Sequence, residues 1–197
     1  MSTYRTDEDL MIAVRDGDVD QLEVLFERYR EPLYDFFARL TANRTVSEDL
    51  VQDVFVRILK YRTTYRQTHR FVTWMYRIAR NSRIDYLKRH KPETADATPE
   101  MAGAVASPGR HLEESEERAL LQRAMMQISE ANRELLVLLR YQEMKYEDIA
   151  ELLGIEIGAV RTRVHRAMKE LRDTFIRLRS NETSCNATNS GTTFPTT

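Results

Sequence analysis

Basic and aromatic side chains are concentrated in one stretch of the sequence, from Arg57 to Lys91. It contains eleven Lys or Arg residues and a single acid, Asp85, and six aromatic residues are interleaved with them: Tyr61, Tyr65, Phe71, Trp74, Tyr76 and Tyr86. Cations neutralise phosphates, and aromatic rings stack on unpaired bases at about 1–3 kcal/mol per base. Duplex DNA requires only the cations, so this combination indicates binding of a single nucleic-acid strand.

Residues 71–88 are predicted to form the helix that positions these groups. At about 100° per residue, one face is apolar, and Trp74 falls on the other face with four polar residues: Arg77, Asn81, Asp85 and Lys88. A tryptophan on an arginine-bearing face suggests an external partner. The alternative is that a neighbouring helix covers Trp74, since large aromatic side chains are mostly buried.

A second candidate site lies between Tyr146 and Lys169, where the spacing predicts a helix-turn-helix. Gly154 can adopt the left-handed turn conformation, and Ala150 is small where the two helices would cross. The outward face of the second helix is predicted to carry Gly158, Arg161, Thr162, His165, Arg166 and Lys169. Such a face fits the major groove of DNA. The alternative is a helical hairpin with a solvated basic face.

Residues suited to enzyme chemistry are missing from the sequence. No His or Cys cluster has the spacing of metal ligands, no glycine-rich phosphate loop is present, and no Ser or Cys nucleophile has a recognisable setting. We therefore expect a protein that is not an enzyme, with no catalytic residue, no metal, no cofactor and no small-molecule substrate.

Charge is segregated along the 197 residues although the net charge is only −1. Residues 1–56 and 113–160 are acidic, whereas 57–91 and 161–179 are basic. This alternation predicts two modules, each with an acidic part and a DNA-facing basic part. The single cysteine, Cys185, fits a reducing compartment. Because there is no signal segment or long apolar run, we expect a cytoplasmic protein that does not itself span a membrane.

The predicted fold is all-α, with two small helical domains joined by a flexible linker. Gly17 should end the first helix, Pro32 should restart or kink the second, and a capping box of Thr45 and Glu48 should begin the third. The predicted boundaries are 1–90 for the N-terminal domain, 91–112 for the linker, 113–179 for the helix-turn-helix domain and 180–197 for a disordered tail.

Three stretches together resemble the bacterial RNA polymerase sigma factors of the extracytoplasmic function (ECF, group IV) group. They are SEDLVQDVFVRI at 47–58, FVTWMYRIARNSRIDYLKR at 71–89 and YEDIAELLGIEIGAVRTRVHRAMKEL at 146–171. The resemblance implies a protein that directs promoter-specific initiation of transcription. Its first domain corresponds to sigma region 2 and its second to sigma region 4.

The resemblance also implies roles for individual residues. Core polymerase would be bound through Asp49, Gln52, Asp53 and Phe55. In the melted minus-ten element, Tyr65 and Asn81 would read bases, Trp74 would lie at the edge of the melted region, and four residues would contact phosphates: Arg77, Arg80, Lys88 and Arg89. The minus-thirty-five duplex would be contacted by Arg161, Thr162, Arg163, His165, Arg166 and Lys169.

The implied partners are promoter DNA, an anti-sigma factor, and core RNA polymerase through the clamp helices and the flap of its two large subunits. One departure is Glu156, where the group usually has a serine that caps the recognition helix. Two other functions remain open. A stand-alone helix-turn-helix regulator of duplex DNA would leave Trp74 and Asn81 unexplained, and a sigma-mimicking decoy would need no groove-reading arginines.

Overall fold

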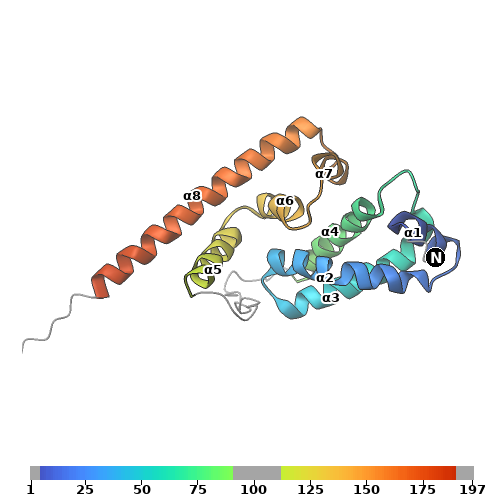
Figure 1. The fold of residues 1–197 in the computed structure, drawn as a ribbon, viewed down its shortest axis with the longest axis horizontal. Coiled ribbons are helices and arrows are strands. Elements are labelled where there is room, and N and C mark those ends of the chain that lie inside the picture. Colours follow the sequence, from blue (N-terminus) through green and yellow to red (C-terminus); the bar gives the residue numbers. More distant parts are fainter. Residues whose placement is uncertain (1–4, 91–111, 190–197) are drawn as a thin grey trace, which may run out of the picture.

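The computed structural model describes residues 5–90 and 112–189, and all regular elements in these two ranges are helices (Figure 1), as predicted. The first unit consists of α1 (Asp7–Asp16), α2 (Gln21–Thr41), α3 (Arg44–Tyr61), the short 3-10 helix η1 (Arg62–Thr64) and α4 (Phe71–Arg89). The second unit consists of α5 (Leu112–Gln127), α6 (Glu130–Arg140), α7 (Tyr146–Leu153) and α8 (Ile157–Asn189). The predicted linker falls outside the described residues, apart from Leu112, where α5 begins. In the described ranges no helix is both long and apolar enough to cross a bilayer.

The first two helices follow from local signals in the sequence, with one exception. Thr6 caps α1 in a capping box with Asp9, and Gly17 ends the helix at a φ of +114°, as expected. Pro32 does not interrupt α2, which continues through it to Thr41. Packing provides the physical reason, because the buried residues of α2 lie on both sides of the proline: Leu25, Leu33, Phe36, Phe37 and Leu40.

The start of α3 differs from the predicted capping box at Thr45. The helix begins one residue earlier, after Asn43, whose side-chain oxygen accepts a hydrogen bond from the Val46 amide at 3.0 Å. Ser47 is buried and donates its hydroxyl to the Asn43 carbonyl at 2.6 Å. Asparagine is a strong N-cap residue, and the buried serine leaves Thr45 inside the first turn.

Helix α4 is the central element of the first unit. It packs against α1 and α3, and α7 of the second unit covers another side. Phe71, Met75, Ile78 and Ala79 are buried as their spacing predicted, but Leu87 at the end of the same stripe is 40% exposed. Tyr76 is instead buried, because α4 is covered on more sides than one apolar stripe indicates.

The second unit contains the predicted helix-turn-helix. Gly154 ends α7 in the left-handed conformation, with a φ of +65°, and α8 begins at Ile157. Ala150 and Val160 are buried between the two helices. Glu170 of α8 secures the start of α6 by accepting hydrogen bonds from Asn132 and from the Ser129 amide, and these bonds lower the pKa of its carboxyl group.

Helix α8 extends through Asn189, so residues 180–189 are helical rather than part of a disordered tail. Its earlier turns are anchored by burial of Val160, Val164 and Ala167. A helix that is already nucleated propagates through polar residues at little cost, and no glycine or proline follows before Gly191 and Pro195. The rest of the predicted tail, 190–197, lies outside the described residues.

The two units pack against each other, which the sequence did not predict. Figure 1 shows α7 beside α4, and α6 contacts α2. Arg133 of α6 is 9% exposed and donates to the carbonyls of Met125 and Met126, at 2.8 and 2.7 Å, and of Leu40 in α2, at 3.3 Å. Burial lowers the pKa of Arg133. The larger of the two buried apolar clusters therefore includes side chains from both units.

Two glycines near this turn provide a stability test with opposite signs. An added Cβ would meet no atom within 4 Å at either Gly154 or Gly158, but only Gly154 has a positive φ. We expect Gly154→Ala to lower the free energy of unfolding by about 1 kcal/mol, because alanine is strained there. Gly158→Ala should raise it by about 0.5 kcal/mol, through helix propensity in α8. Urea denaturation measures both changes, and destabilisation by both substitutions would contradict the turn.

Candidate nucleic-acid interface

The basic residues of α4 fall into two groups by exposure. Asn81, Lys88 and Arg89, in the middle and last turns, are exposed. Arg77 is also exposed and Arg80 is half-buried, but both contact the second unit. The polar face predicted from the spacing therefore exists, and only its C-terminal half faces solvent freely in this structure.

The two aromatic residues predicted to meet melted DNA lie against each other. Tyr65 is 1% exposed, and its hydroxyl donates to the His69 carbonyl at 3.0 Å. Its burial raises the pKa of the phenol to about 12. The Trp74 ring is half-buried, with its centroid 5.2 Å from that of Tyr65 and 6.3 Å from that of Phe71. Tyr65 thus supports the loop before α4 and does not present its ring to a base, whereas Trp74 is partly covered, between the two alternatives.

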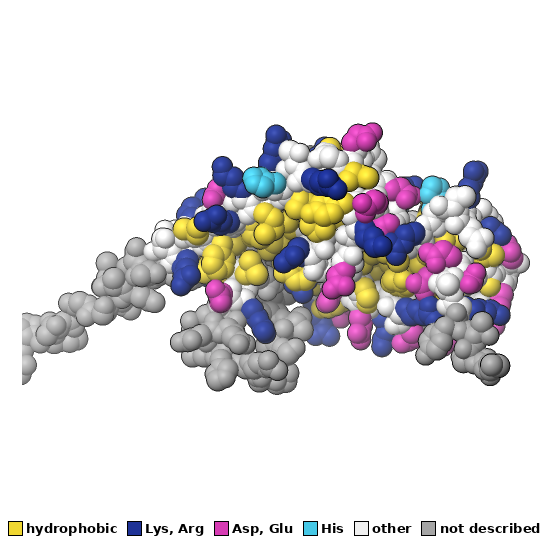
Figure 2. Space-filling view, turned by 45° about the horizontal axis from the view of Figure 1, so that its top comes forward, with side chains coloured by type: hydrophobic (Ala, Val, Ile, Leu, Met, Phe, Trp, Pro, Cys, Tyr) yellow, Lys and Arg dark blue, Asp and Glu magenta, His cyan; other side chains and the backbone are white. Residues whose placement is uncertain are grey.

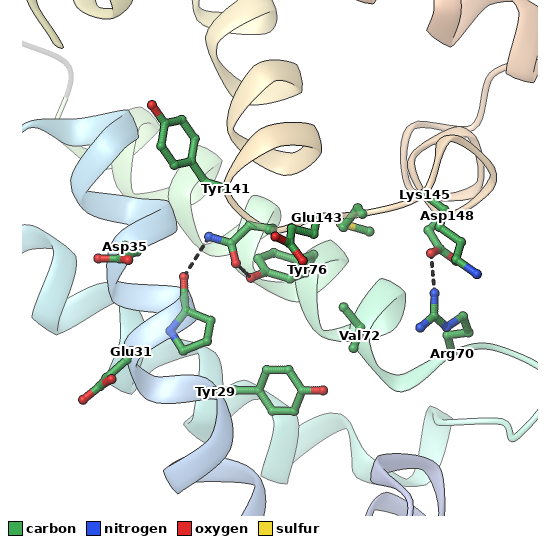
Figure 3. Close-up of a pocket in the computed structure, with 13 residues that line it drawn as sticks. Tyr29, Glu31, Asp35, Arg70, Val72, Tyr76, Tyr141, Glu143, Lys145 and Asp148 are labelled. Atoms are coloured by element: carbon green, nitrogen blue, oxygen red, sulfur yellow. Dashed lines mark hydrogen bonds and ion pairs between the residues drawn. The ribbon is translucent and has the colours of Figure 1, made fainter. Parts of the chain in front are cut away.

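The arginines at the start and middle of α4 pair with carboxylates of the second unit. Arg70 forms an ion pair with Asp148 at the rim of a cleft of about 520 Å³ between the units (Figure 3). Arg80 donates to both oxygens of Glu134, at 3.1 and 3.2 Å. Two further contacts join the same helices, Arg77 to Glu151 at 3.8 Å and Arg83 to Glu130 at 2.5 Å. These partners lie far along the chain and were not predicted.

A hydrogen-bonded glutamine joins the same interface at the cleft (Figure 3). The buried Tyr76 hydroxyl donates to the side-chain oxygen of Gln142, and the Gln142 amide nitrogen donates to the Pro32 carbonyl at 3.1 Å. Burial raises the pKa of Tyr76 well above its ordinary value, so this hydroxyl remains a donor. Gln142 therefore bridges α2 and α4 from the loop that follows α6.

The predicted polymerase-binding residues of α3 separate into exposed and buried positions. Asp49 and Gln52 are exposed. Asp53 is half-buried and forms an ion pair with Arg57 at 2.8 Å. Phe55 is 7% exposed, and its ring centroid lies 4.9 Å from that of Phe26. Phe55 is therefore a core residue that supports α3, because its position in the helix faces α2.

Exposed apolar residues on α3 were missed by the sequence analysis. Val56 is 64% exposed and Leu59 is 37% exposed, although the sequence placed Leu59 in the buried stripe. Gln52, Val56 and Leu59 follow the i, i+4, i+7 spacing of one helical face, which was the available signal. This face of α3 is therefore partly apolar and accessible.

The basic face of α8 is exposed over its first four turns. Val160, Val164 and Ala167 turn inward, so the six predicted residues are all exposed: Arg161, Thr162, Arg163, His165, Arg166 and Lys169. The Thr162 hydroxyl also donates to the Gly158 carbonyl, at 3.1 Å. Figure 2 shows Lys and Arg side chains along α8. The described residues contain no group of three or more His, Cys, Asp or Glu that could hold a metal ion.

Two family models match the chain in the order of its two units. The model of sigma-70 region 2 matches residues 25–93, which include α3 and α4. The model of sigma-70 region 4 matches residues 118–171, which include α6, α7 and the exposed basic turns of α8. Both candidate DNA-binding faces therefore lie inside matched regions.

Relatives of similar length match most of this chain. The RNA polymerase sigma factor CarQ of Myxococcus xanthus is 33% identical over 159 residues, which cover 81% of this chain and 91% of CarQ. The ECF RNA polymerase sigma factor SigW of Bacillus subtilis is 29% identical, with 81% of this chain and 91% of SigW covered. The ECF RNA polymerase sigma-E factor of Escherichia coli K12 is 28% identical, with 87% and 95% covered.

Solved structures have the same fold. CnrH, in complex with the cytosolic domain of CnrY, superposes with a TM-score of 0.66 at 23% identity, covering 85% of this chain and 95% of CnrH. The sigma factor RpoE of Bartonella quintana, in complex with the anti-sigma factor NepR, superposes with a TM-score of 0.65 at 21% identity, covering 77% and 94%. With two region models, a helix-turn-helix of the predicted geometry and these relatives, the chain belongs to the sigma-70 family of RNA polymerase sigma factors, in its extracytoplasmic function group.

Proposed function

We propose that this sigma factor binds core RNA polymerase and directs it to promoters by reading the minus-ten element as a melted single strand and the minus-thirty-five element as duplex. The observation that carries the proposal is the presence of two separate basic helical faces, on α4 and α8, each inside its own matched region. Neither unit needs to perform chemistry, because both act by binding.

Recognition of the minus-thirty-five duplex is assigned to the start of α8. Its exposed arginines, among them Arg161 and Arg166, can form bidentate hydrogen bonds with guanine edges or contact phosphates. Burial of Val160 and Val164 fixes the helix on α7 in the arrangement of a helix-turn-helix. Glu156 is exposed just before α8, where its negative charge suits the helix N-terminus but opposes nearby phosphates.

Capture of the minus-ten strand is assigned to α4. Asn81 is exposed and can hydrogen-bond an unstacked base, and Lys88 and Arg89 lie one and two turns further on, where they can neutralise phosphates. The exposed part of the Trp74 ring can stack at the edge of the melted region. Because the protein prefers the open strand, it shifts the opening equilibrium of the base pairs without forming or breaking a bond.

Binding to core polymerase is assigned to the exposed face of α3. Asp49 and Gln52 supply polar contacts, and Val56 and Leu59 supply apolar area beside them. Phe55 and Asp53 act from beneath this face, by packing on Phe26 and by pairing with Arg57. An apolar patch next to polar groups is a common composition for a protein interface.

An anti-sigma factor is the proposed inhibitory partner. Two of the sigma-like structures were solved as complexes, CnrH with the cytosolic domain of CnrY and RpoE with the anti-sigma factor NepR. The exposed apolar residues of α3 would suit such a partner, which would then compete with core polymerase. The alternative of a stand-alone duplex-binding regulator is not favoured, since a region 2 model matches residues 25–93.

Run-off transcription tests the proposed function directly. Total genomic DNA from the source cell should yield new discrete transcripts with core polymerase and this chain together, and aligned upstream sequences should show two spaced elements. Core polymerase alone provides the background, and core with a known sigma factor provides the activity control. Failure of the folded chain to generate new transcripts in that setting would contradict the proposal.

Variants of α4 should separate melting from assembly. Asn81→Ala and Trp74→Ala should each lower initiation on a duplex promoter by about tenfold, because about 1–3 kcal/mol of base contact is lost. Binding to core polymerase should be unchanged. The same promoter with a pre-melted minus-ten bubble is the matched template, and it should recover most of the activity. Equal losses on both templates would remove the role in melting.

Variants of α8 should weaken duplex recognition. Arg166→Ala should reduce binding of a minus-thirty-five duplex by the second unit within the holoenzyme about tenfold, as expected for loss of one guanine or phosphate contact. The matched control is Arg172→Ala, an equal loss of charge about 9 Å further along the same helix. Competition binding with duplexes that carry or lack the element measures the effect. Identical losses for the two variants would indicate attraction by net charge alone.

A further inference from the structure

The second unit covers part of the face that we assign to the minus-ten strand. All four ion pairs between α4 with its N-cap and helices α6 and α7 have the same polarity, with arginine from the first unit and carboxylate from the second. They are Arg70–Asp148, Arg77–Glu151, Arg80–Glu134 and Arg83–Glu130. On the face shown in Figure 2, acidic and basic side chains lie side by side where the units meet.

Two of these carboxylates are held in place rather than waving in solvent. The side chain of Asp148 is 11% exposed and that of Glu134 is 10% exposed. Partly buried charge pairs are less screened by salt than surface pairs, so these contacts favour a defined arrangement of the units. Glu134 binds Arg80 through both oxygens, in the way a phosphate group would.

The loop between α6 and α7 also engages the first unit. Gln142 bridges the Tyr76 hydroxyl and the Pro32 carbonyl. The next residue, Glu143, has a φ of +49°, a conformation that costs a non-glycine residue free energy and persists only where surrounding contacts hold it. The loop is therefore shaped by its contact with the first unit.

We propose that the free chain inhibits itself, because Glu134 and Asp148 of the second unit occupy the arginines that must bind the phosphates of the minus-ten strand. This inference rests on the proposed function of α4. The carboxylates and the DNA strand compete for the same donors, so binding of the strand requires separation of the units. Affinity in the free chain is then reduced by the small fraction of open molecules.

Core polymerase is the natural agent of opening. A partner that holds the two units at separate places binds only the open chain, and it therefore shifts the population towards the state with an accessible α4. The closed chain would remain inactive at promoters until assembly. This self-inhibition acts within one polypeptide and needs no anti-sigma factor, although such a factor could stabilise the same closed state.

A double variant with a matched control tests the closed state in the full chain. Glu134→Gln with Asp148→Asn removes both partners, and Glu147→Gln with Asp173→Asn removes two exposed charges elsewhere on the second unit. By small-angle X-ray scattering, the first pair should increase the radius of gyration and the control should not. The free first variant should bind a fluorescein-labelled single-stranded oligonucleotide about tenfold more tightly than wild type, and the control less than about twofold more tightly.

A charge exchange guards against simple loss of folding. Arg80→Glu alone should open the chain in scattering, and Arg80→Glu with Glu134→Arg should restore the compact state, with circular dichroism reporting helix content throughout. An unchanged radius of gyration in the Glu134→Gln/Asp148→Asn variant, or equal DNA affinities for that variant and its control, would overturn self-inhibition. The proposed function would be unaffected by that result, because it is judged separately by run-off transcription with the wild-type chain.

Discussion

Burial of α4 on several sides is the constraint on which the rest of the structure depends. Phe71, Met75 and Ala79 are fully buried in the first unit, and Tyr76 is buried where the second unit meets it. A helix packed in this way cannot rotate, because rotation would expose apolar side chains at about 1.5–3 kcal/mol each. The direction in which Arg77, Arg80 and Asn81 point is therefore determined by the core.

The same packing explains why aromatic residues near α4 have different accessibility. Tyr65 and Phe71 contact Trp74 edge-on or tilted, so the three rings form one cluster at the start of the helix. Tyr65 lies inside this cluster, and only Trp74 keeps part of its ring exposed. A stacking surface for DNA is thus supported from below by a buried phenol that also fixes the preceding loop through His69.

Charge in this protein acts within the molecule as well as towards DNA. The acidic residues of the second unit and the basic residues of α4 would cancel in a net-charge count, and the structure places four of these pairs in contact. The α8 face carries a similar excess of cations and stays exposed. The two candidate DNA-binding faces consequently differ in availability, with α8 open and α4 half covered.

The sequence by itself determined the features that depend on local spacing. Helical fold, the glycine ends at Gly17 and Gly154, the exposed face of α8 and the family all follow from residues close together in the chain. Only the tertiary structure decided which faces are covered. Helical periodicity states which residues share a face but not what packs on that face, and for this reason Tyr65, Phe55 and Leu87 differed from expectation. Likewise, Arg70 and Asp148 lie 78 positions apart, and no local pattern relates two such residues before the chain has folded.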